Sequence, residues 1–189
     1  MTFETIWFYN RFHDQIITLS HDQADLSRWQ SDNLANSRTR GIEESVQIQL
    51  AKGFSFKGAY TYLDTAVLGL DGTSQVQSYF HLGQQLLRRP RHAGSYVAVW
   101  QNKRAIIEAG AVWRGRMLDA EPNWGLSAGQ FTNPFYTTFD SSAQLQWKSG
   151  VWLIAKASNL LNRTYEESLG FPALGRNLMF GVKWHKNLK

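Results

Sequence analysis

The segment Phe135-Tyr-Thr-Thr-Phe-Asp-Ser-Ser-Ala-Gln-Leu-Gln-Trp147 decides the fold, because its side chains alternate in polarity. Its odd-numbered positions are apolar or small, with an aromatic residue at each end, and its even-numbered positions from 138 to 146 are polar. A period of two places these two sets on opposite faces of a β-strand. The segment therefore predicts a strand with one apolar face.

The same alternation recurs along the chain, as in Val46, Ile48 and Leu50 near the start and in Leu178, Phe180, Val182 and Trp184 near the end. Helical spacing is scarce by comparison. The alternating stretches predict about eight strands, over residues 2–17, 30–50, 54–64, 88–101, 104–116, 135–147, 151–160 and 176–184. The chain is thus predicted to be all-β.

The connections between these strands alternate strictly between short and long. Residues 51–53, 102–103 and 148–150 are short enough for hairpin turns, whereas 18–29, 65–87, 117–134 and 161–175 are long. Short turns at one end and long loops at the other are typical of antiparallel up-and-down transmembrane β-barrels of the outer membrane. A soluble sandwich with an inward apolar face has the same periodicity, but four long loops at one end favour the membrane barrel.

Composition excludes several other classes of protein. The 189 residues are 43% apolar and 19% charged, which excludes a disordered chain, and the lack of Cys excludes disulfides and thiolate chemistry. No apolar run reaches the roughly 18 residues of a spanning helix. The first residues lack the pattern of a secretory signal. The net charge of +5 is densest at Arg88-Arg89-Pro90-Arg91-His92, but the basic residues are too dispersed to favour nucleic-acid binding.

Enzymatic chemistry finds little support. The five His residues, at 13, 21, 81, 92 and 185, show neither an HExxH pattern nor paired metal-ligand spacing, and no glycine-rich phosphate loop is present. We therefore expect no catalytic residue, no metal site and no cofactor.

Several motifs follow one another in a recognisable order. They are Asn36-Ser-Arg-Thr-Arg40-Gly41-Ile-Glu43, Ala59-Tyr-Thr-Tyr-Leu-Asp64, Arg89-Pro90-Arg91-His92 at the opening of a strand, Asn159-Leu-Leu-Asn162-Arg-Thr-Tyr165 and Gly170-Phe-Pro172-Ala-Leu-Gly175-Arg176. In order and spacing this series, which spans almost the whole chain, resembles the barrel of TonB-dependent receptors. Trp184 stands where such barrels end on an aromatic assembly signal, although five residues follow it.

The resemblance implies that residues 1–189 are part of a β-barrel domain, the last eight strands of a 22-stranded, plugged barrel. It implies a bacterial outer-membrane transporter, in contact with lipid and lipopolysaccharide, for a ferric siderophore, cobalamin or similar nutrient. Neither the plug nor a TonB box is recognisable, so contact with TonB would run through an absent N-terminal region. The alternative is a complete small eight-stranded barrel with an adhesin or structural role.

Two groups of residues are singled out. The motif residues are expected to serve barrel architecture, with Arg40 and Glu43 as a charge pair and Asn159 and Asn162 capping turns: Asn36, Arg40, Gly41, Glu43, Asn159, Tyr165, Pro172, Gly175, Arg176 and Trp184. Ligand contacts, if the resemblance holds, are expected in two long loops. These candidates are Tyr79, Phe80, His81, Glu121, Asn123 and Trp124.

Overall fold

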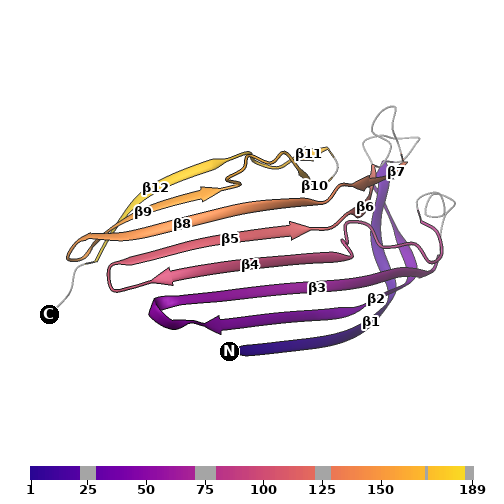
Figure 1. Ribbon diagram of the computed structural model, residues 1–189. Helices are drawn as coiled ribbons and strands as arrows, with labels where there is room; N and C mark the ends of the chain where they lie inside the picture. The colour runs from indigo at the N-terminus through magenta and orange to yellow at the C-terminus, as the bar shows by residue number, and fades with distance from the viewer. Residues whose placement is uncertain (22–28, 71–79, 122–128, 169, 186–189) are drawn as a thin grey trace.

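A computed structural model shows eight long antiparallel strands in one twisted sheet (Figure 1). It describes the backbone of residues 1–21, 29–70, 80–121, 129–168 and 170–185. It also describes their side chains, except those of residues 17–35 and 120–129. The strand order β1-β2-β3-β4-β5-β8-β9-β12 follows the chain, so each strand pairs with the strand before it in the sheet. The predicted all-β, up-and-down architecture with eight strands is confirmed.

The sheet strands and their bounds are β1 (Thr2–His21), β2 (Trp29–Gln49), β3 (Phe54–Gly69), β4 (His92–Gln101), β5 (Ala105–Arg114), β8 (Tyr136–Lys148), β9 (Val151–Ser158) and β12 (Asn177–Trp184). Two smaller hairpins, β6 (Met117–Glu121) with β7 (Gly129–Asn133) and β10 (Glu166–Ser168) with β11 (Phe171–Pro172), lie in the long connections.

The three tight turns lie at one end of the sheet and the long connections at the other (Figure 1). Residues Ala51–Gly53 form a short 3-10 turn in which Lys52 and Gly53 have φ of 59° and 82°. The Asn102 carboxamide oxygen accepts hydrogen bonds from the backbone N–H groups of Arg104 and Ala105 at 2.7 and 2.8 Å. Positive φ values and a side-chain cap thus shape these two turns.

Several boundaries differ from the sequence prediction, among them the end of β3, which runs to Gly69 instead of residue 64. β4 begins at His92 instead of residue 88, because Arg88 adopts a positive φ of 56° and Pro90 has no N–H to donate to the ladder. The first hairpin continues to His21 and Trp29, deep into a predicted loop. Predicted loops 117–134 and 161–175 contain the β6–β7 and β10–β11 hairpins, so part of each loop is ordered by its own ladder.

The strand registers divide the sheet into two faces, because residues directly opposite one another share a face. We call one the outward face. On β5, β8 and β9 its central positions are Ile107, Ala109, Ala111, Phe139, Ser141, Ala143, Leu145, Leu153, Ala155 and Ala157. The inward face carries polar residues at the same levels, among them Glu108, Asp140, Gln144 and Lys156.

Aromatic residues edge the outward face at both ends. Near the tight turns, Phe54 lies against Trp100 at 6.2 Å, and Trp147 and Trp184 lie at the same end of the sheet, on β8 and β12. Toward the long connections, Tyr60 stacks on Trp113 at 6.1 Å, and Tyr62 lies 5.3 Å from His92. Among the outward positions between these edges only Glu44, opposite Tyr60, is charged. Two aromatic belts around an apolar band are typical of a membrane-spanning β-barrel wall.

The length of the strands fits this interpretation. β8 has 13 residues, which at about 3.4 Å per residue span roughly 44 Å along the strand. A tilt of about 45° reduces this to a rise of roughly 30 Å, the thickness of a bilayer's hydrocarbon core.

Few of the described apolar side chains are buried. The buried apolar residues are Ala66, Val67, Phe80, Leu86, Ala105, Met117 and Tyr136. Large side chains on the outward face are instead exposed: Trp147 is 65% exposed and Phe180 is 81% exposed. No protein layer covers the outward face in the part of the chain that the structure describes, so its apolar surface is available to lipid.

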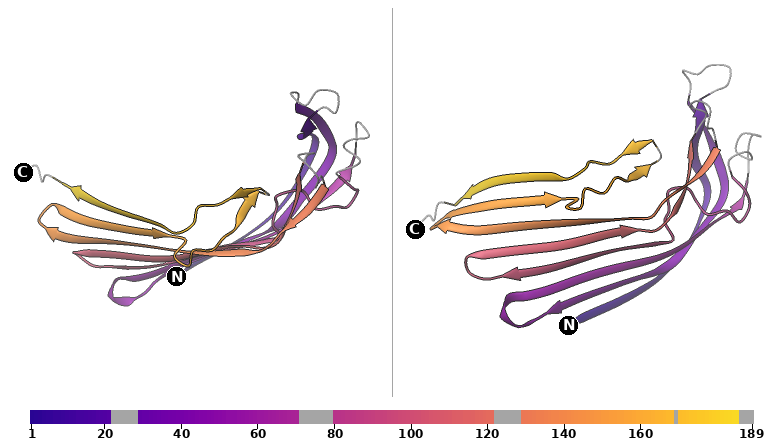
Figure 2. Two further views of the ribbon diagram at one scale, coloured as in Figure 1. Left: turned by 90° about the horizontal axis from the view of Figure 1, so that it is seen from above. Right: turned by 45° about the horizontal axis from the view of Figure 1, so that its top comes forward.

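The sheet is open. β1 and β12 form its two edges, and no register among the described strands joins them. Figure 2 shows the sheet as a curved wall whose long-connection end turns out of the plane of the strands. A closed ring of eight strands, which was the alternative from the sequence, is therefore not what the structure shows.

No helix among the described residues has the length and hydropathy to cross a membrane.

Candidate functional site

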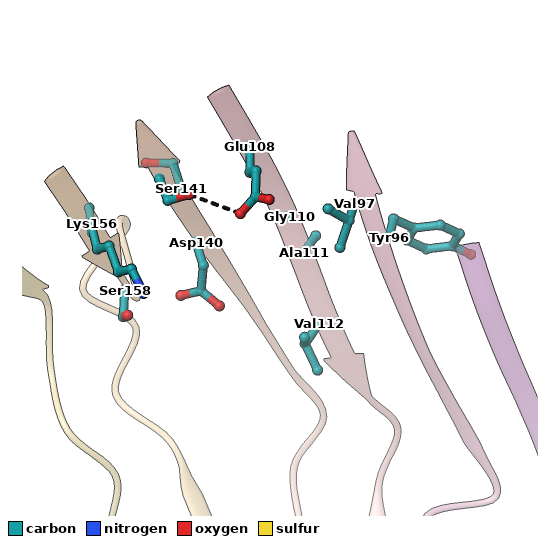
Figure 3. Close-up of a pocket in the computed structure, with 12 residues that line it drawn as sticks. Tyr96, Val97, Glu108, Gly110, Ala111, Val112, Asp140, Ser141, Lys156 and Ser158 are labelled. Carbon is teal, nitrogen blue, oxygen red and sulfur yellow. Dashed lines mark hydrogen bonds between the residues drawn. The ribbon is translucent and has the colours of Figure 1, made fainter. Parts of the chain in front are cut away.

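A shallow hollow of about 300 Å³, lined by both polar and apolar side chains, opens over β4, β5, β8 and β9. Glu108, Asp140 and Lys156 extend from three neighbouring strands on the same side of the sheet (Figure 3). The Ser142 hydroxyl donates a hydrogen bond to the Glu108 carboxylate at 2.9 Å. Gly110 lies between Val97 and Asp140 in the register, and its missing side chain leaves the hollow open. The arrangement suits a polar partner surface, because hydrogen-bonding groups line an accessible concavity.

The described part of the long connection after β3 folds back onto the inward face. Phe80 and Leu86 pack against Val67 and are 4% and 7% exposed. The Leu86 N–H donates to the Thr65 hydroxyl at 3.0 Å, and the Val67 N–H donates to the Gln84 carbonyl at 2.9 Å. This connection is thus anchored by its own small apolar cluster.

A charged contact ties the same connection to the β6–β7 hairpin. Arg88 Nε donates to the Asp119 carboxylate at 2.8 Å, and the Asn133 amide donates to its other oxygen at 3.1 Å. Asp119 is fully buried, whereas the Arg88 side chain is about half exposed. A buried carboxylate requires such partners, because an uncompensated charge would be costly in this environment.

Replacing Arg88 by methionine should loosen this connection while keeping much of the aliphatic stem. Because Arg88 is half exposed, water screens the ion pair, and we expect a loss of about 1 kcal/mol in local stability. Chymotryptic cleavage near Phe80 should then become roughly fivefold faster. The matched control is Arg89→Met at the exposed neighbouring position, and equal cleavage rates for the two variants would contradict a role for the Arg88–Asp119 contact.

Two tyrosines stack where β8 begins. The rings of Tyr136 and Tyr165 lie 4.2 Å apart at 27°, and the Tyr136 hydroxyl is 3.4 Å from the Glu167 carboxylate. Burial raises the pKa of the Tyr165 phenol, and the negative charges of Glu167 and Asp140 raise it further. The Tyr165 phenol therefore keeps its proton, and its capacity to donate a hydrogen bond, to a higher pH than an exposed tyrosine does.

The motif after β9 forms one hydrogen-bonded turn. The Asn159 side chain donates to the carbonyls of Arg163 and Leu174, at 2.8 and 3.2 Å, and accepts from the Arg163 N–H. The Asn162 carboxamide oxygen accepts from the Arg176 N–H at 2.8 Å. A side chain at Gly175 would meet that oxygen at 2.8 Å. Asn159, Asn162, Gly175 and Arg176 are thus brought together, although 14 residues separate Asn162 from Arg176.

The expected pair between Arg40 and Glu43 is wrong. Arg40 pairs instead with Asp64 on β3, at 2.7 Å, and Arg38 reaches the same carboxylate oxygen at 3.1 Å. Residues three apart in a strand point to opposite faces, so Glu43 cannot meet Arg40. Asn36 lies at a register shift between β2 and β3, and its side-chain oxygen is buried without a hydrogen bond.

The expected ligand residues are only partly described. Phe80 is buried, but His81 is exposed and its backbone N–H donates to the Gln84 side chain at 2.9 Å. Tyr79, Asn123 and Trp124 lie outside the described residues, as does the Glu121 side chain. Pro172 opposes Glu166 in the β10–β11 pair, and Trp184 ends β12 on the outward face, opposite Val151.

Sequence reasoning missed Asp119, Asn133 and Tyr136 as members of this region. Tyr136 is an even-numbered position, in the set that is otherwise polar in its strand. The β6–β7 residues lay in a predicted loop. Only the pairing of β6 with β7 shows that Asp119 and Asn133 converge, since 14 residues separate them. No group of three or more His, Asp or Glu residues among the described side chains is arranged to hold a metal ion.

Together, the apolar outward band, aromatic belts and polar inward face define a segment of an antiparallel transmembrane barrel wall. A sequence model described as the β-barrel of TonB-dependent receptors matches residues 2–160. The chain belongs to this family, whose members are receptors and transporters of the Gram-negative outer membrane and not enzymes. The predicted family, fold class and location are confirmed.

Relatives and solved structures agree with this assignment. The metal-pseudopaline receptor CntO of Pseudomonas aeruginosa is 26% identical over 131 residues, covering 69% of this chain but 18% of the receptor. The siderophore receptor PiuA from Acinetobacter baumannii has a similar fold, with a TM-score of 0.71 at 17% identity over 96% of this chain and 26% of PiuA. The ferripyoverdine receptor of P. aeruginosa gives 0.70 at 18% identity, over 96% of this chain and 24% of the receptor. The chain thus spans less than a third of these proteins.

Proposed function

We propose that this chain forms part of the barrel wall of a receptor that imports a ferric siderophore or a related metal chelate across the outer membrane. The observation that carries the proposal is the family match over residues 2–160. The relative named a metal-pseudopaline receptor and the fold shared with siderophore receptors support this class of ligand. Cobalamin, the other ligand expected from the sequence, has no such support.

We further propose that the open edges and the inward face are completed by other parts of the receptor. β1 and β12 would pair with preceding strands of a larger barrel, which removes their unpaired backbone groups from lipid. The hollow that contains Glu108, Asp140 and Lys156 would face a plug domain filling the lumen. Energy from TonB would reach the receptor through that plug, and the anchored connections would border the extracellular entrance.

Deletion of the gene that encodes this chain should reduce uptake of the cognate chelate to the background of passive entry. A panel of radiolabelled ferric siderophores and other metallophore complexes should be tested alongside cobalamin. Uptake of one chelate should be lost, be restored by the wild-type gene and cease when the proton gradient is collapsed. If every chelate enters the deletion strain at the wild-type rate while cobalamin does not, the proposed ligand class is wrong.

A further inference from the structure

Three arginines gather on the outward face beyond the aromatic belt of Tyr60 and Tyr62. Arg40 lies opposite Tyr9 on one side and Asp64 on the other, and Arg11 lies opposite Arg38. The register places Ile42 opposite Tyr62, and Arg40 and Arg38 are the next two outward positions toward the long connections. The guanidinium groups therefore project from the outside of the barrel wall and not into its lumen.

The level of this cluster is that of the lipid head groups. Tyr62, His92 and Trp113 mark the belt at the long-connection end, where amphipathic rings meet the membrane interface. Arg38 lies four residues beyond Ile42, which is about 13 Å along the strand. Trp7, 67% exposed, and Ile42, 37% exposed, lie immediately on the membrane side. Apolar surface suited to an acyl chain thus adjoins cationic surface suited to a head group.

The positive charges of this cluster outnumber the carboxylates that pair with them. Arg38 and Arg40 share the single Asp64 carboxylate, and Arg11 makes no ion pair within the described residues. Three guanidinium groups against one carboxylate leave two positive charges. On the membrane side, the next acid on this face is Glu44, four residues from Arg40, or about 13 Å along the strand. Arg38 also has a buried Nε without a hydrogen-bond acceptor.

Like charges directly opposite in a sheet destabilise it unless a counter-charge lies between them. Phosphate suits this position, because its oxygens accept paired hydrogen bonds from the planar fork of a guanidinium group. We propose that Arg11, Arg38 and Arg40 bind a phosphate of lipid A, the acylated and phosphorylated anchor of lipopolysaccharide in the outer leaflet. The adjoining apolar surface at Trp7 and Ile42 favours this lipid over a free anion. The inference rests on the proposed function only in placing this wall in an outer-membrane receptor.

The test compares Arg11→Gln/Arg40→Gln with the wild type in the complete gene product that carries this chain, purified in detergent from outer membranes. Arg38, the most buried of the three, is left in place. Binding is measured for three probes: diphosphoryl lipid A, chemically dephosphorylated lipid A and inorganic phosphate. The wild type should prefer diphosphoryl over dephosphorylated lipid A on the order of tenfold, and the double variant should lose most of this preference. Tightly co-purifying lipid A should fall in parallel.

The matched control is Lys57→Gln/Lys183→Gln, which removes two positive charges from the inward faces of β3 and β12. Its lipid A preference should equal that of the wild type. A third variant, Arg11→Lys/Arg40→Lys, keeps the charge and should retain part of the preference if the glutamine pair folds poorly.

Equal binding of the phosphorylated and dephosphorylated lipids by the wild type would overturn the inference. So would tight binding of inorganic phosphate alone, or an equal loss in the inward-face control. Chelate uptake measured on the same strains separates the two proposals. If lipid A shows no specific binding while the chelate is still imported, only the inference about the arginines fails. If lipid A binds as expected but no chelate is imported, only the proposed function fails.

Discussion

Arginine at Ala143 is expected to destabilise the folded barrel by about 2–4 kcal/mol, the cost of a cationic side chain near the membrane midplane on a lipid-facing strand position. Ala143 is central on the outward face of β8, opposite Ile107 and Ala155. The guanidinium group of an arginine there must lie in hydrocarbon, or its side chain must extend toward the distant membrane interface. The measurement is the fraction of gene product that is inserted and heat-modifiable on a gel, followed by urea titration in detergent.

The matched control is arginine at the next residue, Gln144. Gln144 points to the inward face, between Ser142 and Gln146 along the strand and opposite Ile106 and Ile154, so a charge there stays out of the lipid. Gln144→Arg should change the stability by less than about 1 kcal/mol. Equal losses for the two variants would mean that the outward face does not meet lipid, and a soluble two-layer arrangement would regain support.

Gly41→Ala is expected to cost about 1–3 kcal/mol, at the upper end of that range, because the new methyl group has no room. A Cβ at Gly41 would lie 2.1 Å from the Tyr62 carbonyl oxygen and 2.9 Å from Cζ of Phe8. The carbonyl belongs to the β2–β3 ladder and cannot rotate away as a side chain could. The two strands would have to separate locally, which weakens the hydrogen bonds between them.

The comparison is Gly181→Ala on β12, where the nearest atom to a new Cβ is 3.9 Å away on Ile154. That distance is an ordinary van der Waals contact, so the alanine should leave the stability within about 0.5 kcal/mol of the wild type. Thermal loss of the heat-modifiable band in a common detergent measures both variants. A Gly41→Ala protein as stable as Gly181→Ala would show that β2 and β3 tolerate a wider separation.

By itself, the sequence determined the strand content, the alternation of short and long connections and the two faces of most strands. These properties are local, since the two-residue period of a strand assigns each side chain to a face without knowledge of its neighbours. The turns at Lys52–Gly53 and Asn102 are local for the same reason. The boundary at His92 was missed, although Pro90 just before it was a visible signal.

Only the tertiary structure decided which distant residues meet. The partner of Arg40 is Asp64 and not Glu43, because the β2–β3 register and not chain proximity sets the contact. Asp119 meets Arg88, and Tyr136 meets Tyr165, through pairings between strands and connections that no local pattern specifies. The openness of the sheet is also a tertiary property, since alternation along a strand carries no information on whether its first and last neighbours join.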